Sequence, residues 1–222
     1  VFLLLGMTLE PVSTIQSALE VSEMEIFVIT SIPQLSAAKT PGQPFAFAQP
    51  AQALLSTDPR VHAIQALSWR NWQVVMNTVA LLQIPLSSFR CGRALCSKDT
   101  YALFVSKVLT VALAVQANFS MVVLLEDSVR WPITLREQLA PLPAMVAEFE
   151  RAERSGSTTS AFVARLGDTG TRGLALSRRA CQQLLHLVYT VGANDRIGAW
   201  LLRHFAPVHT FRLQPDDTRL GT

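Results

Sequence analysis

The sequence predicts an α/β fold in which a mostly parallel sheet is flanked by helices. Short apolar runs without a helical period alternate along the chain with longer segments that carry one apolar face. Strands that alternate with helices are typical of parallel sheets. The 222 residues are 50% apolar and 16% charged, which suits one sizeable core and excludes a disordered chain or a coiled coil. We therefore expect a single domain over residues 1–222.

In the first third of the chain, residues 24–31 (MEIFVITS) are an apolar, β-branched run and are predicted to be a buried strand. Residues 33–50 hold four prolines and are predicted to be a loop. A second strand is expected over 61–67. Residues 69–82 place apolar side chains on one helical face, and the helix is expected to stop at Ile84-Pro85.

The middle of the chain holds its longest apolar stretch. After a polar turn at 91–97, Ser97 is a suitable N-cap for a helix that ends near Ala117, with Asp99 in its first turn. Residues 121–125 (MVVLL) form the clearest strand and run directly into Glu126-Asp127-Ser128.

The last third continues the alternation. Residues 136–154 are helical in composition but are divided by Pro141 and Pro143. The remaining expected elements are a strand over 161–166, a glycine-rich turn over 167–173, helices over 177–189 and from Asn194 or Asp195 to His204, and a strand over 208–213.

Two segments raise the question of a membrane. Residues 101–125 are long enough to span one, but the polar residues within them and the turn at 118–120 favour a buried helix followed by a strand. Residues 1–20 begin without Met, and they fit the remnant of an N-terminal anchor or signal as well as they fit an ordinary strand. A membrane-embedded helical protein is the alternative that uses 101–125 as a span.

The charge of the chain does not indicate nucleic acid as a partner, because 19 basic and 16 acidic residues give a net charge of only +3. Sixteen of the basic residues are arginines, and twelve of these follow residue 128. Guanidinium groups form paired hydrogen bonds with phosphates and carboxylates, so the second half of the chain is the better candidate for an anionic ligand.

Glu126 and Asp127 are the first candidate site. Two carboxylates at the end of a buried strand repel each other near a low-dielectric interior, and a divalent cation or sugar hydroxyls would offset that cost. The alternative is that both acids face water and cap the next helix. Ligands of parallel sheets bind at the carboxyl ends of the strands, which is where these acids lie.

Other features have a plain structural interpretation beside the functional one. Asp195 fits a helix N-cap or a general base, and the turn from Gly167 to Gly173, with Arg172, fits a tight turn or a phosphate cradle. Cys91 and Cys96 fit a disulfide in a secretory compartment, which leaves Cys181 as a packed thiol. The four histidines show no metal-ligand spacing, and Asn118-Phe119-Ser120 matches a glycosylation pattern that is common by chance.

The order of these features resembles a known family. The run VVLLEDS after a long helix is similar to the acidic signature of GT-A glycosyltransferases, which have a Rossmann-like sheet and use nucleotide sugars. Within residues 98–222, Arg165-Leu-Gly-Asp-Thr-Gly170, then Asn194-Asp195 with Ala-Trp-Leu-Leu, and the closing Leu220-Gly221-Thr222 resemble in order the branching N-acetylglucosaminyltransferase IV family.

The resemblance implies roles for individual residues. Glu126, Asp127 and Ser128 would bind the ribose and the diphosphate of the donor, with Mn²⁺ or Mg²⁺ at Asp127, and Asp195 would be the catalytic base. Ser128 stands where the family has its last acid, and Arg219 is nearest to where it has a histidine. Because serine is a poor metal ligand and arginine is none, Arg172 and Arg219 are the alternative partners of the diphosphate.

The expected function is transfer of a sugar from a UDP-sugar donor to a hydroxyl of a glycan or glycoprotein acceptor, with inversion. The family also implies the secretory pathway, in the lumen of the Golgi or the endoplasmic reticulum. The alternative is a catalytically silent GT-A-like domain that binds a glycan or a protein.

Overall fold

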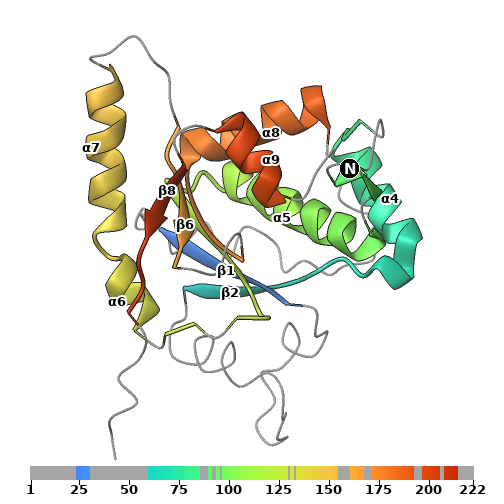
Figure 1. Ribbon diagram of the computed structural model, residues 1–222, viewed down its shortest axis with the longest axis horizontal. Coiled ribbons are helices and arrows are strands. Elements are labelled where there is room, and N and C mark those ends of the chain that lie inside the picture. The colour runs from blue at the N-terminus through green and yellow to red at the C-terminus, as the bar shows by residue number, and fades with distance from the viewer. Residues whose placement is uncertain are drawn as a thin grey trace, which may run out of the picture.

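A computed structural model of the chain confirms the α/β prediction: a six-stranded, mostly parallel mixed sheet lies between two layers of helices (Figure 1). The structure describes residues 24–30, 60–85, 90–91, 94–95, 97–129, 131–132, 134–154, 161–167, 172–192, 197–205 and 208–214. The predicted loop at 33–50 and the segment 1–20 lie outside these residues.

Strands and helices alternate as predicted, except that β6 is followed directly by β7 and that a small strand pair, β3 and β4, precedes α5. The strands of the large sheet are β1 (Glu25–Thr30), β2 (Val61–Gln65), β5 (Met121–Glu126), β6 (Val163–Leu166), β7 (Gly173–Ser177) and β8 (Val208–Phe211). The helices are η2 (Trp69–Asn71), α4 (Trp72–Leu81), α5 (Lys98–Gln116), α6 (Leu135–Leu139), α7 (Leu142–Arg154), α8 (Arg178–Val191) and α9 (Ile197–His204). A small antiparallel pair is formed by β3 (Arg90–Cys91) and β4 (Ala94–Leu95), where the sequence predicted only a turn.

The strand order across the sheet is β2-β1-β5-β7-β6-β8. β1 is parallel to β2 and to β5, and β6 is parallel to β8. β7 runs antiparallel to both of its neighbours, β5 and β6. The sequence did not predict β7, because Gly173–Ser177 is short and lies between a glycine-rich turn and a strong helix pattern.

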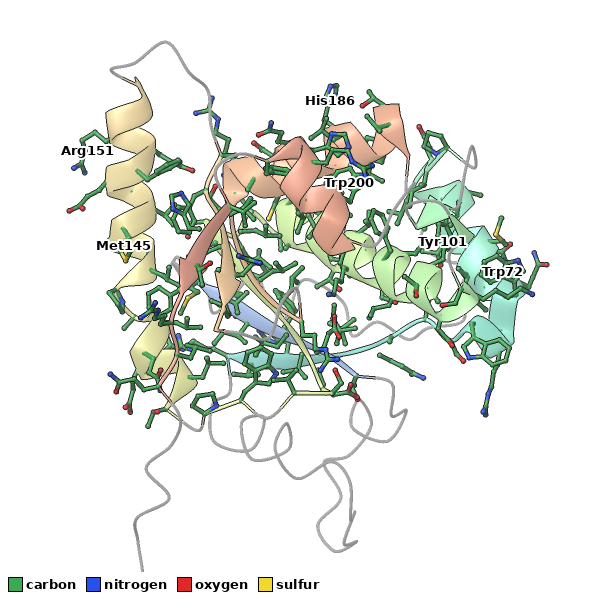
Figure 2. All side chains as sticks on the ribbon, viewed as in Figure 1. Trp72, Tyr101, Met145, Arg151, His186 and Trp200 are labelled. Atoms are coloured by element: carbon green, nitrogen blue, oxygen red, sulfur yellow. The ribbon has the colours of Figure 1, made fainter. Side chains whose placement is uncertain are left out.

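One face of the sheet is covered by α4, α5, α8 and α9 (Figure 1). Trp200 of α9 lies against α5 (Figure 2), with its ring 6.0 Å from that of Phe104 and nearly perpendicular to it. Its indole N–H donates to the carbonyl oxygen of Gly192 at 3.1 Å. The tryptophan of the Ala-Trp-Leu-Leu run is therefore a core residue that fixes α9 to the end of α8.

The other face is covered by α6 and α7, which stand apart from the rest in Figure 1. The break between them falls at Pro141, as the sequence predicts, because proline cannot continue the hydrogen bonding of the preceding helix. β5 is buried on both faces, since Val122 and Leu124 meet the first layer while Val123 and Leu125 meet the second.

α5 is the central helix of the first layer, and its predicted start is confirmed. The Ser97 hydroxyl accepts a hydrogen bond from the Thr100 amide at 3.2 Å, which caps the first turn. Among the described helices α5 alone is long and apolar enough to cross a membrane, by length and composition only. However, 56% of its apolar window is buried within the protein, in the arrangement expected of a core helix.

Gly173 gives a first test of the packing, because it lies close to Trp131 and Leu166 on one face of the sheet. A Cβ atom added there would lie 2.4 Å from Cη2 of Trp131 and 3.0 Å from Cβ of Leu166. We expect Gly173→Ala to lower the free energy of unfolding by about 2 kcal/mol, as overpacking of a core does. Urea denaturation measures this change. In a Trp131→Phe background the alanine should cost less, and an unchanged stability of the single variant would contradict the model of close contact.

Cys181 gives a second test. It is 1% exposed, and burial raises the pKa of its thiol to about 12. Because only the thiolate reacts readily, we expect no modification of Cys181 in the folded protein at pH 8 and complete modification in urea. A Cys91→Ser/Cys96→Ser variant isolates the signal of Cys181. Rapid labelling in native buffer would show that α8 is not docked as described.

Candidate functional site

The candidate site lies at the carboxyl edge of the sheet, between β1 and β5. β2, the next strand of this sheet after β1 in the sequence, lies on the side of β1 away from β5. The strands that follow β5 in the sequence lie on the side of β5 away from β1. The strand order therefore reverses between β1 and β5, and in open α/β sheets ligands bind outside the carboxyl ends of the strands at such a point. The predicted residues Glu126, Asp127 and Ser128 follow β5 at this place.

Asp127 joins the ends of the two strands. Its amide donates to the carbonyl oxygen of Ile29 at 3.2 Å, and its carboxylate accepts a hydrogen bond from the Thr30 hydroxyl at 2.8 Å. Thr30 is fully buried and Asp127 is half-buried. The carboxylate is thus oriented by the last residue of β1 and still reaches the surface.

Glu126 has a different environment. One of its carboxylate oxygens accepts a hydrogen bond from the ammonium group of Lys107 on α5, at 2.5 Å. The Lys107 side chain is 1% exposed and that of Glu126 is 13% exposed. Burial lowers the pKa of Lys107, and the charge and hydrogen bond of Glu126 oppose this shift. The sequence predicts an electrostatic cost for two acids at the end of a buried strand. For Glu126 the buried ammonium group of Lys107 offsets that cost.

The main chain of Glu126 is held as well. Its amide donates to the carbonyl oxygen of Arg172 at 2.8 Å, and its carbonyl oxygen accepts from the indole N–H of Trp131 at 2.9 Å. The first of these bonds brings the end of the glycine-rich turn beside the acidic strand end. Arg172 is exposed, and its main chain lies next to Glu126.

The structure thus brings together four of the predicted residues: Glu126, Asp127, Ser128 and Arg172. Ser128 is exposed, and its hydroxyl lies 3.4 Å from the second carboxylate oxygen of Glu126. Asp195 and Arg219 lie outside the described residues, so the proposed base and the second proposed arginine stay predictions.

Sequence reasoning missed the role of Lys107, although its position gave a usable signal. From Lys107 to the end of α5 the helix rises about 14 Å over nine residues, and β5 returns about 17 Å over five. A helix and a strand joined by a short turn run antiparallel, so these matched lengths place Lys107 level with Glu126. Lys107, the only charged residue in the apolar face of α5, was therefore a candidate partner for Glu126.

The chemistry of the described side chains fits a divalent cation poorly. Mg²⁺ and Mn²⁺ favour several carboxylate oxygens, but Glu126 is neutralised by Lys107 and Ser128 offers only a hydroxyl. Within the part of the chain that the structure describes, no group of three His, Cys, Asp or Glu side chains is placed to hold a metal. The cation expected at Asp127 stays a prediction.

The buried acid Glu25 is not part of this site. It begins β1, at the opposite edge of the sheet, where its carboxylate lies 2.9 Å from the ring of His62. His209 stacks on Phe162 with ring centroids 5.0 Å apart. His62 and His209 thus each contact another side chain within the fold.

The fold and the site define an α/β protein with an acid, Asp127, at the topological switch point of its sheet and an exposed arginine, Arg172, bonded through its main chain to the neighbouring Glu126. No family model matches the sequence, and no curated protein is significantly similar to it.

A double-mutant cycle tests the buried pair. Lys107→Met leaves the Glu126 carboxylate without its buried partner, and we expect it to lower the free energy of unfolding by about 3 kcal/mol. Glu126→Gln should also destabilise the fold, because it removes the negative charge that lies against the buried ammonium group of Lys107. The double variant Lys107→Met/Glu126→Gln should lose less than the sum of the two single changes. Urea denaturation followed by circular dichroism measures all four proteins, and strictly additive losses would contradict the pairing.

Proposed function

We propose that the chain is a GT-A glycosyltransferase domain that transfers a sugar from a UDP-sugar to a hydroxyl of a glycan or glycoprotein. One observation carries the proposal: the carboxylate of Asp127 lies at the switch point between β1 and β5, and the main chain of Arg172 is bonded to the adjacent residue, Glu126. An exposed guanidinium beside this edge suits a diphosphate, and the carboxylate of Asp127 suits ribose or sugar hydroxyls. The resemblance of VVLLEDS to the acidic signature of these enzymes supports the same assignment.

The chemistry follows from the expected roles. The acceptor hydroxyl loses its proton to the base, for which Asp195 is the candidate, and its oxygen attacks the anomeric carbon. The bond from that carbon to the diphosphate oxygen breaks on the opposite side, and UDP leaves with the electron pair, so the anomeric configuration is inverted. Arg172 would stabilise the negative charge that develops on the leaving diphosphate. A location in the Golgi or endoplasmic reticulum lumen goes with this proposal.

Release of UDP from UDP-sugars, with and without an added glycan acceptor, tests the function. We expect Asp127→Asn to lower kcat/KM about a hundredfold, because the amide keeps the hydrogen bond with Thr30 but removes the charge. Glu148→Gln is the matched control, since Glu148 is an exposed acid on α7, away from the switch point.

Two outcomes would change the proposal. UDP binding without any turnover would favour the silent GT-A-like domain. Equal turnover by wild type and Asp127→Asn would remove the switch point from the reaction.

A further inference from the structure

We propose that this site binds the donor diphosphate without a divalent cation, because Lys107 neutralises Glu126 from inside the core and Arg172 supplies the positive charge. The inference rests on the proposed function. It concerns the charge that the carboxyl edge presents to its ligand.

The net charge of the Lys107–Glu126 pair decides how much negative charge Glu126 adds to the edge of the sheet. Lys107 and Glu126 share one titratable proton. The pair is either an ammonium group beside a carboxylate or a neutral amine beside a carboxylic acid. Both arrangements are neutral overall, and a net charge on this buried pair would be costly. Glu126 therefore contributes no net negative charge to the edge of the sheet.

The charge that remains at the edge is that of Asp127 and Arg172. Of the three residues after the core of β5, Ser128 is uncharged and Asp127 alone keeps a carboxylate that faces the edge. One carboxylate is a weak holder of Mg²⁺ or Mn²⁺, which are bound in proteins by several oxygen ligands. The exposed Arg172, which precedes β7 at the same edge of the sheet, supplies a positive charge there.

The position of Arg172 is set by its main chain. Its carbonyl oxygen is fixed by the Glu126 amide at 2.8 Å, and the next residue, Gly173, pairs with Leu125 of β5. The side chain of Arg172 therefore departs from a rigid point beside the acids. A guanidinium forms two parallel hydrogen bonds with phosphate oxygens, which gives a diphosphate the positive partner that a metal would otherwise supply.

Calorimetric titration of the full chain with UDP tests the inference. We expect the dissociation constant in EDTA and in excess Mn²⁺ to agree within about twofold. Arg172→Ala should weaken UDP binding about tenfold or more in both buffers, because a charge-assisted contact is lost. Arg178→Ala is the matched control, because Arg178 is also exposed but begins α8 at the opposite edge of the sheet, where its amide donates to Ser120.

A converse variant keeps the test independent of Arg172. Ser128→Asp adds a second carboxylate at an exposed position beside Asp127, so UDP should bind about tenfold more weakly in EDTA and recover in Mn²⁺. Ser128→Asn has nearly the same shape without the charge and should show no response to Mn²⁺.

Failure of the inference can be distinguished from failure of the function. Binding of UDP by the wild-type chain only in Mn²⁺ would overturn the inference and leave the proposed function standing. Absence of UDP binding in both buffers would overturn both. Equal affinity of Arg172→Ala and wild type would remove Arg172 as the positive partner and overturn the inference.

Discussion

Glu126 is the residue on which the candidate site depends, because every hydrogen-bonding group it carries has a partner. Its amide binds Arg172, its carbonyl oxygen binds Trp131, and its carboxylate lies between Lys107 and Ser128. These contacts come from α5, from the loop after β5 and from the turn before β7. A single position thus ties α5, the loop after β5 and the turn before β7 to the end of β5, and the adjacent Asp127 is held in place as a result.

Much of the fold could be predicted from the sequence because its elements carry strong local signals. Residues 121–125 are uniformly apolar, Ser97 is an effective helix cap, and Pro141 divides α6 from α7. β7 could not be predicted in the same way. Its five residues are stabilised by pairing with β5 and β6, and such pairing between distant segments leaves little trace in a local pattern.

The site was predictable in location but not in electrostatics. A strand that ends in two acids indicates the carboxyl edge of a sheet, and the structure places Glu126 and Asp127 there. The expectation that a ligand offsets both charges assumed that the acids share one environment. They do not, because consecutive residues of a strand point to opposite sides, and Glu126 turns toward α5 while Asp127 bonds to Thr30 at the end of β1.

Stability alone does not explain why a lysine and a glutamate are buried at this position. Apolar residues of similar size often give equal or greater stability than a buried ion pair, since desolvation offsets most of the attraction. The pair does something that apolar residues cannot do: it fixes the direction of the Glu126 side chain and cancels its charge at the edge of the core. Asp127 and the exposed Arg172 then remain as the described charged residues next to Glu126. The interior of the protein thereby determines the electrostatics of its surface.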